Sequence, residues 1–348
     1  MSRILRHISL VVVLLAALSG CKRIPLHERS TNVNLNITTQ LTLDYELDIE
    51  LGDNISDELD KKINGNEPEY YQALFYSSYT NKLVTSQIVY SDGGELFVPA
   101  GDYTMVLYSF GTESTQIRNT TTLHDAEAFT TDITKTMAPQ FKDVKASAKS
   151  AVKSTKSIKS IKGYDDDPII HEPDHLYVAH EAEINIPAFT GKNDTITIHT
   201  NAKSIMEMYS LEVYGLTGVE NIDKVEIFIT GQHKSNFFGA KARNAEPANL
   251  YSTMTPDREN NRLYTVFGTF GKLPGEDNLL YLDISDYGGG KYRYIYDLTE
   301  QFDDPNNTSH KLIVNGDAID IPKAEHGGGG LAPSVDKWEH EEVDVPLG

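Results

Sequence analysis

The chain has 348 residues and a formal net charge of −20, which argues against a nucleic-acid-binding protein, because phosphate backbones are bound by an excess of lysine and arginine. Its single cysteine, Cys21, leaves no partner for an intramolecular disulfide, so any core must be held by packing alone. The length is sufficient for two domains, each large enough for a hydrophobic core.

The N-terminus has the order of a secretory signal. Two arginines precede an apolar run of 11 residues at 8–18, and small residues stand directly before Cys21. A helix needs about 20 residues to cross a bilayer, so a transmembrane helix is disfavoured. The stretch LSGC, residues 18–21, resembles a bacterial lipobox, in which the thiol is acylated and the chain is cut just before it. We expect residues 1–20 to be a lipoprotein signal peptide and Cys21 to carry the lipid, palmitate among its acyl chains. Ordinary signal cleavage beside a stray cysteine is the alternative.

A polar tether, residues 21–30, leads into a long alternating run. Apolar residues occupy every second position, which marks a half-buried strand and excludes a helix, since period 2 would place them all round its surface. At about 3.3 Å per residue the run would reach roughly 60 Å. We therefore expect it to bend or break near residues 38–40 and to serve two sheets. The apolar positions are Val33, Leu35, Ile37, Thr39, Leu41, Leu43, Tyr45, Leu47, Ile49 and Leu51.

Short strands with turn residues between them follow, so we expect residues 31–140 to form an N-terminal β-sandwich. The turns are marked by Asp92-Gly93-Gly94 and by the glycine and aspartate of residues 99–102. The expected strands cover residues 71–77, 83–90, 95–98 and 103–110.

The composition changes after residue 140. Seven lysines recur every three or four residues between Lys142 and Lys162, among serine, alanine, valine and isoleucine. The serines and β-branched residues lower the helix propensity of this stretch. A solvated Lys/Ser-rich linker over residues 141–167 is the favoured interpretation, and a basic helix that touches the membrane is the alternative.

Strand patterns resume in residues 168–348, where short strands with regular turn signals predict a sandwich or a barrel. The last residues alternate again, with Val343, Val345 and Leu347 behind a glycine hinge at residues 327–330. We expect this terminal strand to fold back onto the C-terminal β-sandwich rather than to be donated to a neighbour. The other expected strands cover residues 175–179, 182–187, 194–201, 209–214, 225–230, 263–267, 279–284, 292–297, 311–314 and 318–321.

Catalytic motifs are nearly absent from the sequence. It has no GxSxG elbow and no HExxH motif, and the glycines at 288–290 lack the spacing of a phosphate loop and indicate a hairpin turn. The stretch HEPDHLYVAHE, residues 171–181, is the one candidate metal site. His175 and His180 are five residues apart and would point to opposite faces of a continuous strand, which favours a polar entry into the second domain. We expect no enzyme, no catalytic residue, no metal and no cofactor.

The order of these pieces resembles fimbrillin-like lipoproteins of anaerobic Gram-negative bacteria, and within them a family related to the anchor subunits of type V pili. The resemblance implies an all-β fold of two tandem transthyretin-like β-sandwiches, and a role in surface fibres or adhesion. The stretches that carry it are LHERSTNVNLNI, VPAGDYTMVLYSFGTESTQIRN, EPDHLYVAHEAEINIP, YSLEVYGLTGVENIDKVEIFITG, YTVFGTFG, YIYDLTEQF and GGGGLAPSVDKWEHEEVDVPL.

We therefore expect a lipid-anchored protein of the cell outer membrane, exposed at the surface rather than periplasmic, that anchors or joins a fimbria-like assembly. Its partners would be the membrane, through the lipid on Cys21, and fimbrial subunits, through donation of a strand that completes an open sheet. The alternative function is a surface lipoprotein that binds glycans or nutrients of host or bacterial origin outside any fibre.

Overall fold

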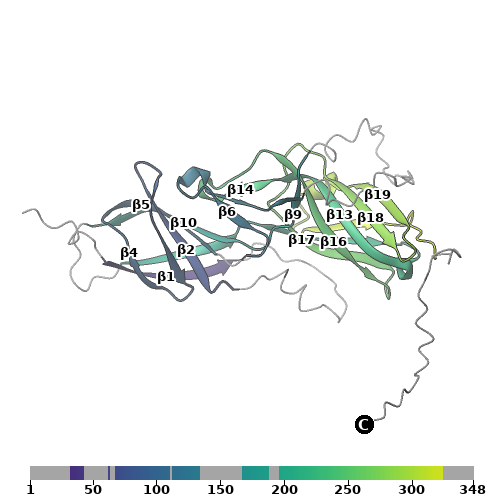
Figure 1. The fold of residues 1–348 in the computed structure, drawn as a ribbon, viewed down its shortest axis with the longest axis horizontal. Coiled ribbons are helices and arrows are strands. Elements are labelled where there is room, and N and C mark those ends of the chain that lie inside the picture. Colours follow the sequence, from purple (N-terminus) through teal and green to yellow (C-terminus); the bar gives the residue numbers. More distant parts are fainter. Residues whose placement is uncertain are drawn as a thin grey trace, which may run out of the picture.

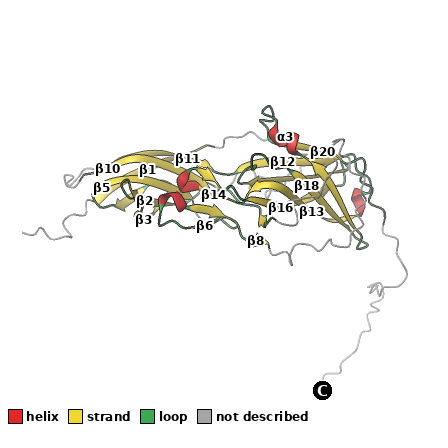
Figure 2. Ribbon diagram, turned by 90° about the horizontal axis from the view of Figure 1, so that it is seen from above, coloured by secondary structure: helices red, strands yellow, loops and turns green. Residues whose placement is uncertain are grey.

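The computed structural model describes residues 32–42, 62, 67–109, 112–133, 167–187 and 196–323. Over these residues the chain is built almost entirely of β-strands in three sheets, which confirms the predicted all-β class. Figures 1 and 2 show an elongated molecule with one large sheet at each end and a smaller sheet between them. Within the described residues, no helix has the length and apolar character that a membrane span requires.

The sheet at one end has seven strands. They are β1 (Asn32–Thr42), β2 (Tyr70–Ser77), β3 (Leu83–Tyr90), β4 (Gly94–Phe97), β5 (Gly101–Ser109), β10 (Tyr177–Ile186) and β11 (Thr197–Ser204). Their order is β3-β2-β5-β10-β11-β1-β4. The central strands are covered on both faces: Phe75 and Met105 pack into one core, whereas Leu74 and Val106 pack into another on the opposite face. Burial on both faces explains why β2 and β5 have nearly continuous apolar runs.

β1 runs without a break through the point where we expected one. It pairs antiparallel with β4 over residues 32–35 and parallel with β11 over residues 36–42. Because the two partners occupy its two edges within one sheet, β1 can change partners without bending. The remainder of the alternating run, residues 43–51, lies outside the described residues.

The sheet at the other end has nine strands and folds into two layers. They are β8 (Asp132–Ile133), β9 (Ile169–His171), β12 (Glu207–Tyr214), β13 (Ile222–His233), β16 (Pro247–Asp257), β17 (Arg262–Thr269), β18 (Leu279–Asp286), β19 (Lys291–Asp297) and β20 (Lys311–Asn315). The main path is β19-β18-β13-β16-β17-β12-β20; β9 pairs with β16, and β8 pairs with β9. The long β16 connects the layers, because residues 249–251 pair with β9 and residues 255–257 pair with β17.

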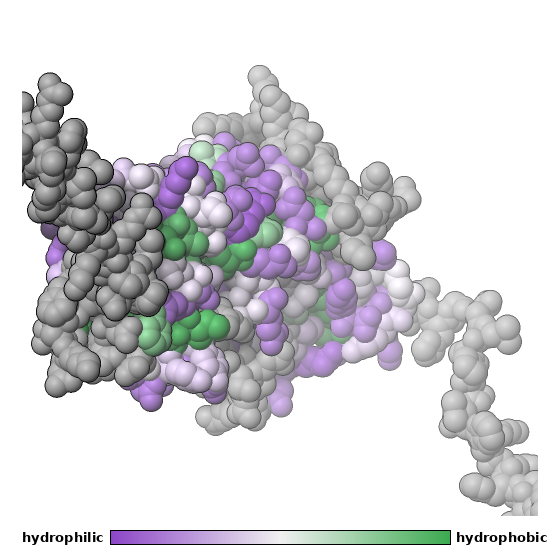
Figure 3. Space-filling model, turned by 60° about the vertical axis from the view of Figure 1, so that its left-hand side comes forward, coloured by the Kyte–Doolittle hydropathy of each residue, from purple (hydrophilic) through white to green (hydrophobic). Residues whose placement is uncertain are grey.

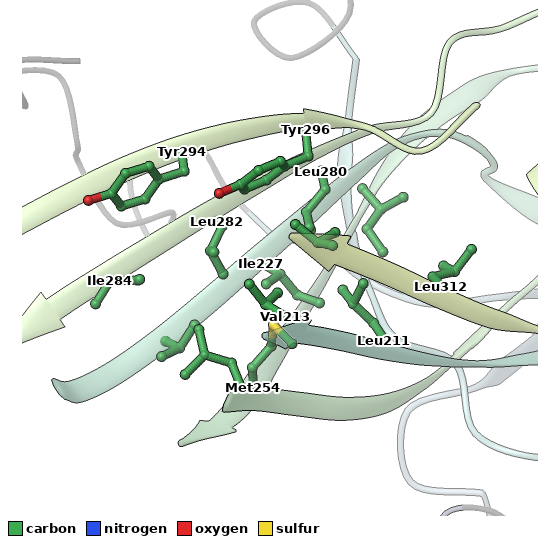
Figure 4. Packing of buried hydrophobic residues seen from close by; sticks show 14 of the residues in the cluster. Leu211, Val213, Ile227, Met254, Leu280, Leu282, Ile284, Tyr294, Tyr296 and Leu312 are labelled. Atoms are coloured by element: carbon green, nitrogen blue, oxygen red, sulfur yellow. The ribbon is translucent and has the colours of Figure 1, made fainter. Parts of the chain in front are cut away.

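The core of this sandwich lies between the two layers. Leu282 and Tyr296, from β18 and β19, are buried in the same cluster as Leu211 and Leu312, from β12 and β20. Figure 4 shows these side chains pointing toward one another across the space between the strands. Each such leucine contributes about 1.5–3 kcal/mol by leaving water.

A third sheet of four strands joins the two ends. It consists of β6 (Gln116–Arg118), β7 (Glu127–Phe129), β14 (Ser235–Phe237) and β15 (Ala242–Arg243), in the order β15-β14-β7-β6. Strands that are more than 100 residues apart in the sequence therefore pair, with Ser235 opposite Phe129. The buried carboxylate of Glu127 accepts hydrogen bonds from Arg118 at 2.6 Å and from the Ser235 hydroxyl at 2.5 Å. This ion pair and its serine link the first part of the chain to the second.

The remaining described elements are single turns of helix. They are η2 (Leu123–Asp125), η3 (Val219–Asn221), η4 (Phe238–Ala240) and α3 (Thr299–Asp303). Phe238 of η4 and Phe270 pack against Leu74 and Val106 of the seven-stranded sheet. One hydrophobic core therefore joins this sheet to residues that adjoin the four-stranded and nine-stranded sheets.

The pairing differs from the expected division of the chain, in which residues 168–348 formed a separate C-terminal sandwich. β10 and β11 lie beyond residue 168, yet they pair with β5 and β1 of the seven-stranded sheet. β8 and β9 stand on either side of the lysine-rich stretch and pair with each other, Asp132 opposite Ile170. The lysine-rich stretch therefore follows β8 and precedes β9, and these two strands are paired with each other. Residues 141–166 of the expected linker, like the signal peptide, the tether and the terminal strand, lie outside the described residues.

Candidate functional site at the sheet edges

The sheet edges are the places where a donated strand could pair, because an edge strand presents main-chain N–H and C=O groups that its own sheet does not use. Two edges of this molecule are each occupied by a glutamine side chain. They differ in what holds that glutamine in place.

The outer edge of β20 is covered by two side-chain amides. Nε2 of Gln301 donates to the Ile313 carbonyl at 2.9 Å, and the Ile313 N–H donates to Oε1 of Gln301 at 2.7 Å. Asn307 makes the same pair of bonds with Lys311, both at 3.0 Å. Because Lys311 and Ile313 are two residues apart, their main-chain groups point off the same edge. The two amides therefore fill the place of a neighbouring strand.

Packing holds this covering segment in place. Tyr209 of β12 has the ring of Phe302, from α3, at 4.8 Å between centroids, and the ring of His310 stacked at 4.7 Å. Asp303 also forms an ion pair with Lys272. Figure 2 shows α3 beside β12 and β20. A strand that approaches β20 must displace a segment with its own aromatic contacts.

The second edge is the seam between β3 and β4. These strands follow one another in sequence, yet β4 pairs with β1, and β3 meets β4 only at a bridge between Tyr90 and Gly93 beside the turn. Farther along the seam, Gln87 supplies the link: its Nε2 donates to the Phe97 carbonyl at 2.6 Å, and the Phe97 N–H donates to its Oε1 at 3.0 Å. One side chain, instead of a ladder of main-chain bonds, closes the curled sheet here.

Exposed apolar side chains border this seam. Ile88 is 57 % exposed and Phe97 is 56 % exposed, and Tyr90 beside them is exposed as well. The Ser91 N–H donates to the Glu69 carbonyl of the β2 side, so by alternation the main-chain groups of Ile88 point toward the seam. Figure 3 brings this end of the molecule forward and shows hydrophobic spots among hydrophilic residues on the described surface. Large exposed apolar residues on an edge strand indicate an interaction surface.

In the stretch that we considered as a metal site, residues 171–181, two acidic side chains form hydrogen bonds that connect separate parts of the fold. A carboxylate oxygen of Asp174 accepts the Thr115 N–H at 2.7 Å, which fixes the loop before β6. Glu172 accepts the Gly268 N–H and the Ser252 hydroxyl, both at 2.8 Å, and so joins the segment after β9 to the nine-stranded sheet. Both acids have structural partners.

His175 and His180 of the same stretch have different surroundings. His175 precedes β10, and its Nε2 lies 3.0 Å from the Lys62 carbonyl. His180 is on β10, where burial, followed by the nearby charge of Lys241, lowers its pKa to about 4. Within the described part of the chain, no group of three His, Cys, Asp or Glu side chains could hold a metal ion.

Cys21, the one site residue that the sequence predicted, lies outside the described residues. The structure adds three residues that the sequence did not single out, namely Gln87, Gln301 and Asn307. No spacing or composition distinguishes these amides from other surface amides, because their role depends on which distant main chain they reach.

Comparison with solved structures shows proteins whose fold resembles that of this chain. The chain is similar to a candidate adhesin from Bacteroides ovatus ATCC 8483, with 19% sequence identity, a TM-score of 0.54 and coverage of 88% of this chain and 98% of that one. It is also similar to the fimbrial anchor protein Mfa2 from Porphyromonas gingivalis, with 12% identity, a TM-score of 0.43 and coverage of 82% and 90%. The first of these likenesses shows a shared fold.

Sequence comparison gives the family. No curated protein matches the chain in sequence. Residues 58–252 match a family model described as a domain of unknown function, DUF5119. That match covers more than half of the 348 residues, so the chain belongs to the DUF5119 family.

Proposed function

We propose that this chain is a non-enzymatic lipoprotein of the outer membrane that anchors, or is an accessory subunit of, a fimbria-like surface assembly with a role in adhesion. The observation that carries the proposal is the shared fold with a candidate adhesin over 98% of that protein's length. A lipid on Cys21 holds the chain at the membrane, and the folded part faces the cell surface.

The seam between β3 and β4 is the strand-acceptor edge in this proposal. An extended segment of a fimbrial subunit pairs with the main chain at Ile88 and displaces the amide of Gln87 from Phe97. The exposed side chains of Ile88 and Phe97 then contact alternate side chains of the incoming strand. β20 does not accept a strand, because Gln301 and Asn307 occupy its edge.

A matched pair of variants tests the acceptor edge. Ile88 and Ile313 are both exposed isoleucines on edge strands, at 57 % and 44 %, and each lies beside a glutamine that closes its edge. The tagged mature chain is used to recover identified fimbrial subunits from detergent-solubilised cells. We expect Ile88→Lys to reduce their recovery at least about tenfold, equivalent to about 1.4 kcal/mol, and Ile313→Lys to leave it unchanged.

Two results would count against these statements. Equal recovery by Ile88→Lys and the wild type would remove the seam as the acceptor edge. Failure of the wild type to recover any fimbrial subunit would remove the fimbrial assignment itself. The lipid anchor has a separate test, in which Cys21→Ser moves the processed protein from the membrane pellet to the soluble fraction; a processed mutant that still pellets contradicts the anchor.

A further inference from the structure

Among the described residues, Tyr79 is the most exposed of the large hydrophobic side chains, at 83 %. It lies in the turn between β2 and β3, which is closed by a hydrogen bond from the Asn81 N–H to the Ser77 carbonyl at 2.8 Å. Its hydroxyl donates to Oδ2 of Asp102 at 3.0 Å. The hydroxyl is tethered while the ring stays in water, so the apolar ring is presented outward in one orientation.

Asp102 belongs to a second fixed pair. It lies on β5 opposite Asn185 of β10, and Nδ2 of Asn185 donates to Oδ1 of Asp102 at 2.7 Å. These hydrogen bonds, first from Asn185 and then from Tyr79, lower the pKa of Asp102, so the group is a carboxylate at neutral pH. Ring, carboxylate and amide thus form one row across the ends of three strands.

The row keeps hydrogen-bonding capacity toward solvent. Each carboxylate oxygen has a second lone pair beyond the bond it accepts, and the Asn185 amide has a carbonyl oxygen and a second N–H. An aromatic face beside such polar groups matches a ligand that has an apolar face and neighbouring hydroxyls. A pyranose sugar has both, because its C–H groups form flat patches while its hydroxyls donate and accept at its rim.

We propose that Tyr79, Asp102 and Asn185 form a subsite for a neutral carbohydrate, with the ring of Tyr79 stacked on the sugar and the carboxylate and amide bound to adjacent hydroxyls. An anionic ligand is disfavoured by the charge of Asp102 and by the net charge of −20. The inference rests on the adhesive role proposed above and names the chemistry to which the protein adheres.

A second exposed tyrosine offers a matched control. Tyr287 lies in the turn between β18 and β19, is 63 % exposed, and has its hydroxyl bound by Arg258 at 2.9 Å. Its ring is therefore tethered in a comparable way, but its partner is a guanidinium instead of a carboxylate and amide pair. Removing the ring of Tyr79 or of Tyr287 distinguishes a specific sugar subsite from non-specific binding by any exposed aromatic side chain.

The test uses the mature full-length chain on an array of immobilised neutral oligosaccharides and polysaccharides that end in glucose, galactose, mannose or fucose. We expect the wild type to bind at least one of these classes and Tyr79→Ala to weaken that binding at least about tenfold, with Tyr287→Ala unchanged. Asp102→Asn keeps the shape and removes the charge, and we expect an intermediate loss. Melting temperatures equal to the wild type show that the variants are folded.

Absence of binding to every sugar on the array would overturn the inference, and so would equal binding by Tyr79→Ala and Tyr287→Ala. The recovery of fimbrial subunits by Tyr79→Ala is measured in parallel. If the wild type binds sugar but recovers no fimbrial subunit, the fimbrial assignment fails and the subsite stands. If fimbrial subunits are recovered and no sugar binds, the subsite fails alone.

Discussion

The edge of β20 and the seam between β3 and β4 are closed by the same device, a glutamine amide that bonds both the N–H and the C=O of one edge residue. At β20, Asn307 adds a second amide of the same kind, and the packing of the Phe302 ring against Tyr209 holds the segment in place. At the seam, away from the Tyr90–Gly93 bridge beside the turn, Gln87 is the one amide in the described residues that closes the edge. A hydrogen bond contributes only about 0.5–1.5 kcal/mol net, so an amide by itself closes an edge weakly. The packing behind it decides whether a partner can open the edge.

The two large sheets are joined by a common hydrophobic core and by the four-stranded sheet, which hold them more tightly than a linker would. We predict that trypsin cuts among the lysines at residues 142–162 and gives two fragments on a denaturing gel. β8–β9 pairing and the four-stranded sheet hold the fragments together, so they should elute as one species in size-exclusion chromatography. Two separate peaks would contradict the shared core.

Lowering the pH should reduce the free energy of unfolding through protonation of His180, which lies on β10 of the seven-stranded sheet. Its pKa falls from 6.5 to about 4 on folding, chiefly through burial. The unfolded chain therefore binds more protons in this window, and stability contributed by the neutral imidazole is lost as pH falls from about 6.5 to about 4. The full loss is about 3 kcal/mol.

Urea unfolding at pH 7 and pH 4 measures this loss, and His180→Gln serves as the control because it cannot titrate. We expect a smaller difference between the two pH values for His180→Gln than for the wild type. An identical difference in both proteins would show that His180 does not carry the effect. Hydrogen exchange that rises in β10 before β12 would locate the change in the expected sheet.

The aromatic packing that supports the amides at the β20 edge can be tested by removing the Phe302 ring. Phe302→Ala deletes a partly buried ring that packs on Tyr209 and should cost about 2 kcal/mol, less than the 3–5 kcal/mol of a fully buried phenylalanine. It should also release Gln301 and Asn307 from the edge. We expect faster hydrogen exchange at Lys311 and Ile313 and the appearance of dimers at high concentration. Unchanged exchange at both residues would show that the amides hold the edge without the ring.

The sequence indicated most strands well and their pairing poorly. β3, Leu83–Tyr90, coincides with the expected residues 83–90 because β-branched and aromatic residues, which favour strands, fill most of it. β16 was missed because proline stands at both of its ends, Pro247 and Pro256, and serine and threonine fill much of its interior. β10 and β11 had clear strand patterns, but alternation does not say which sheet a strand joins. Their assignment depends on contacts with residues about 70 to 160 positions away.

The candidate sites were less predictable for the same reason. Tyr79 and Asp102 are 23 residues apart, and the sequence marked the turn that leads to Asp102 but not the turn that holds Tyr79. Their hydrogen bond depends on how β2 and β5 align. Gln87 and Gln301 have ordinary positions in the sequence. Only the lipidation of Cys21 depends on a local pattern, and it remains a prediction.

The smallest effect on stability should come from replacing the two glutamines themselves. Gln87→Ala and Gln301→Ala each remove two hydrogen bonds at an exposed edge, where water replaces the lost partner, so each should cost about 1 kcal/mol or less in urea unfolding. Their effects on pairing should differ. Gln87→Ala leaves, among the described residues, only the Tyr90–Gly93 bridge beside the turn to close the seam. Recovery of fimbrial subunits should therefore increase, because the incoming strand no longer displaces the amide. Gln301→Ala leaves Asn307 and the Phe302 contact in place, so recovery should stay at the wild-type level. If Gln87→Ala lowers recovery, the glutamine takes part in binding the partner, and the seam is a built contact instead of a closed edge.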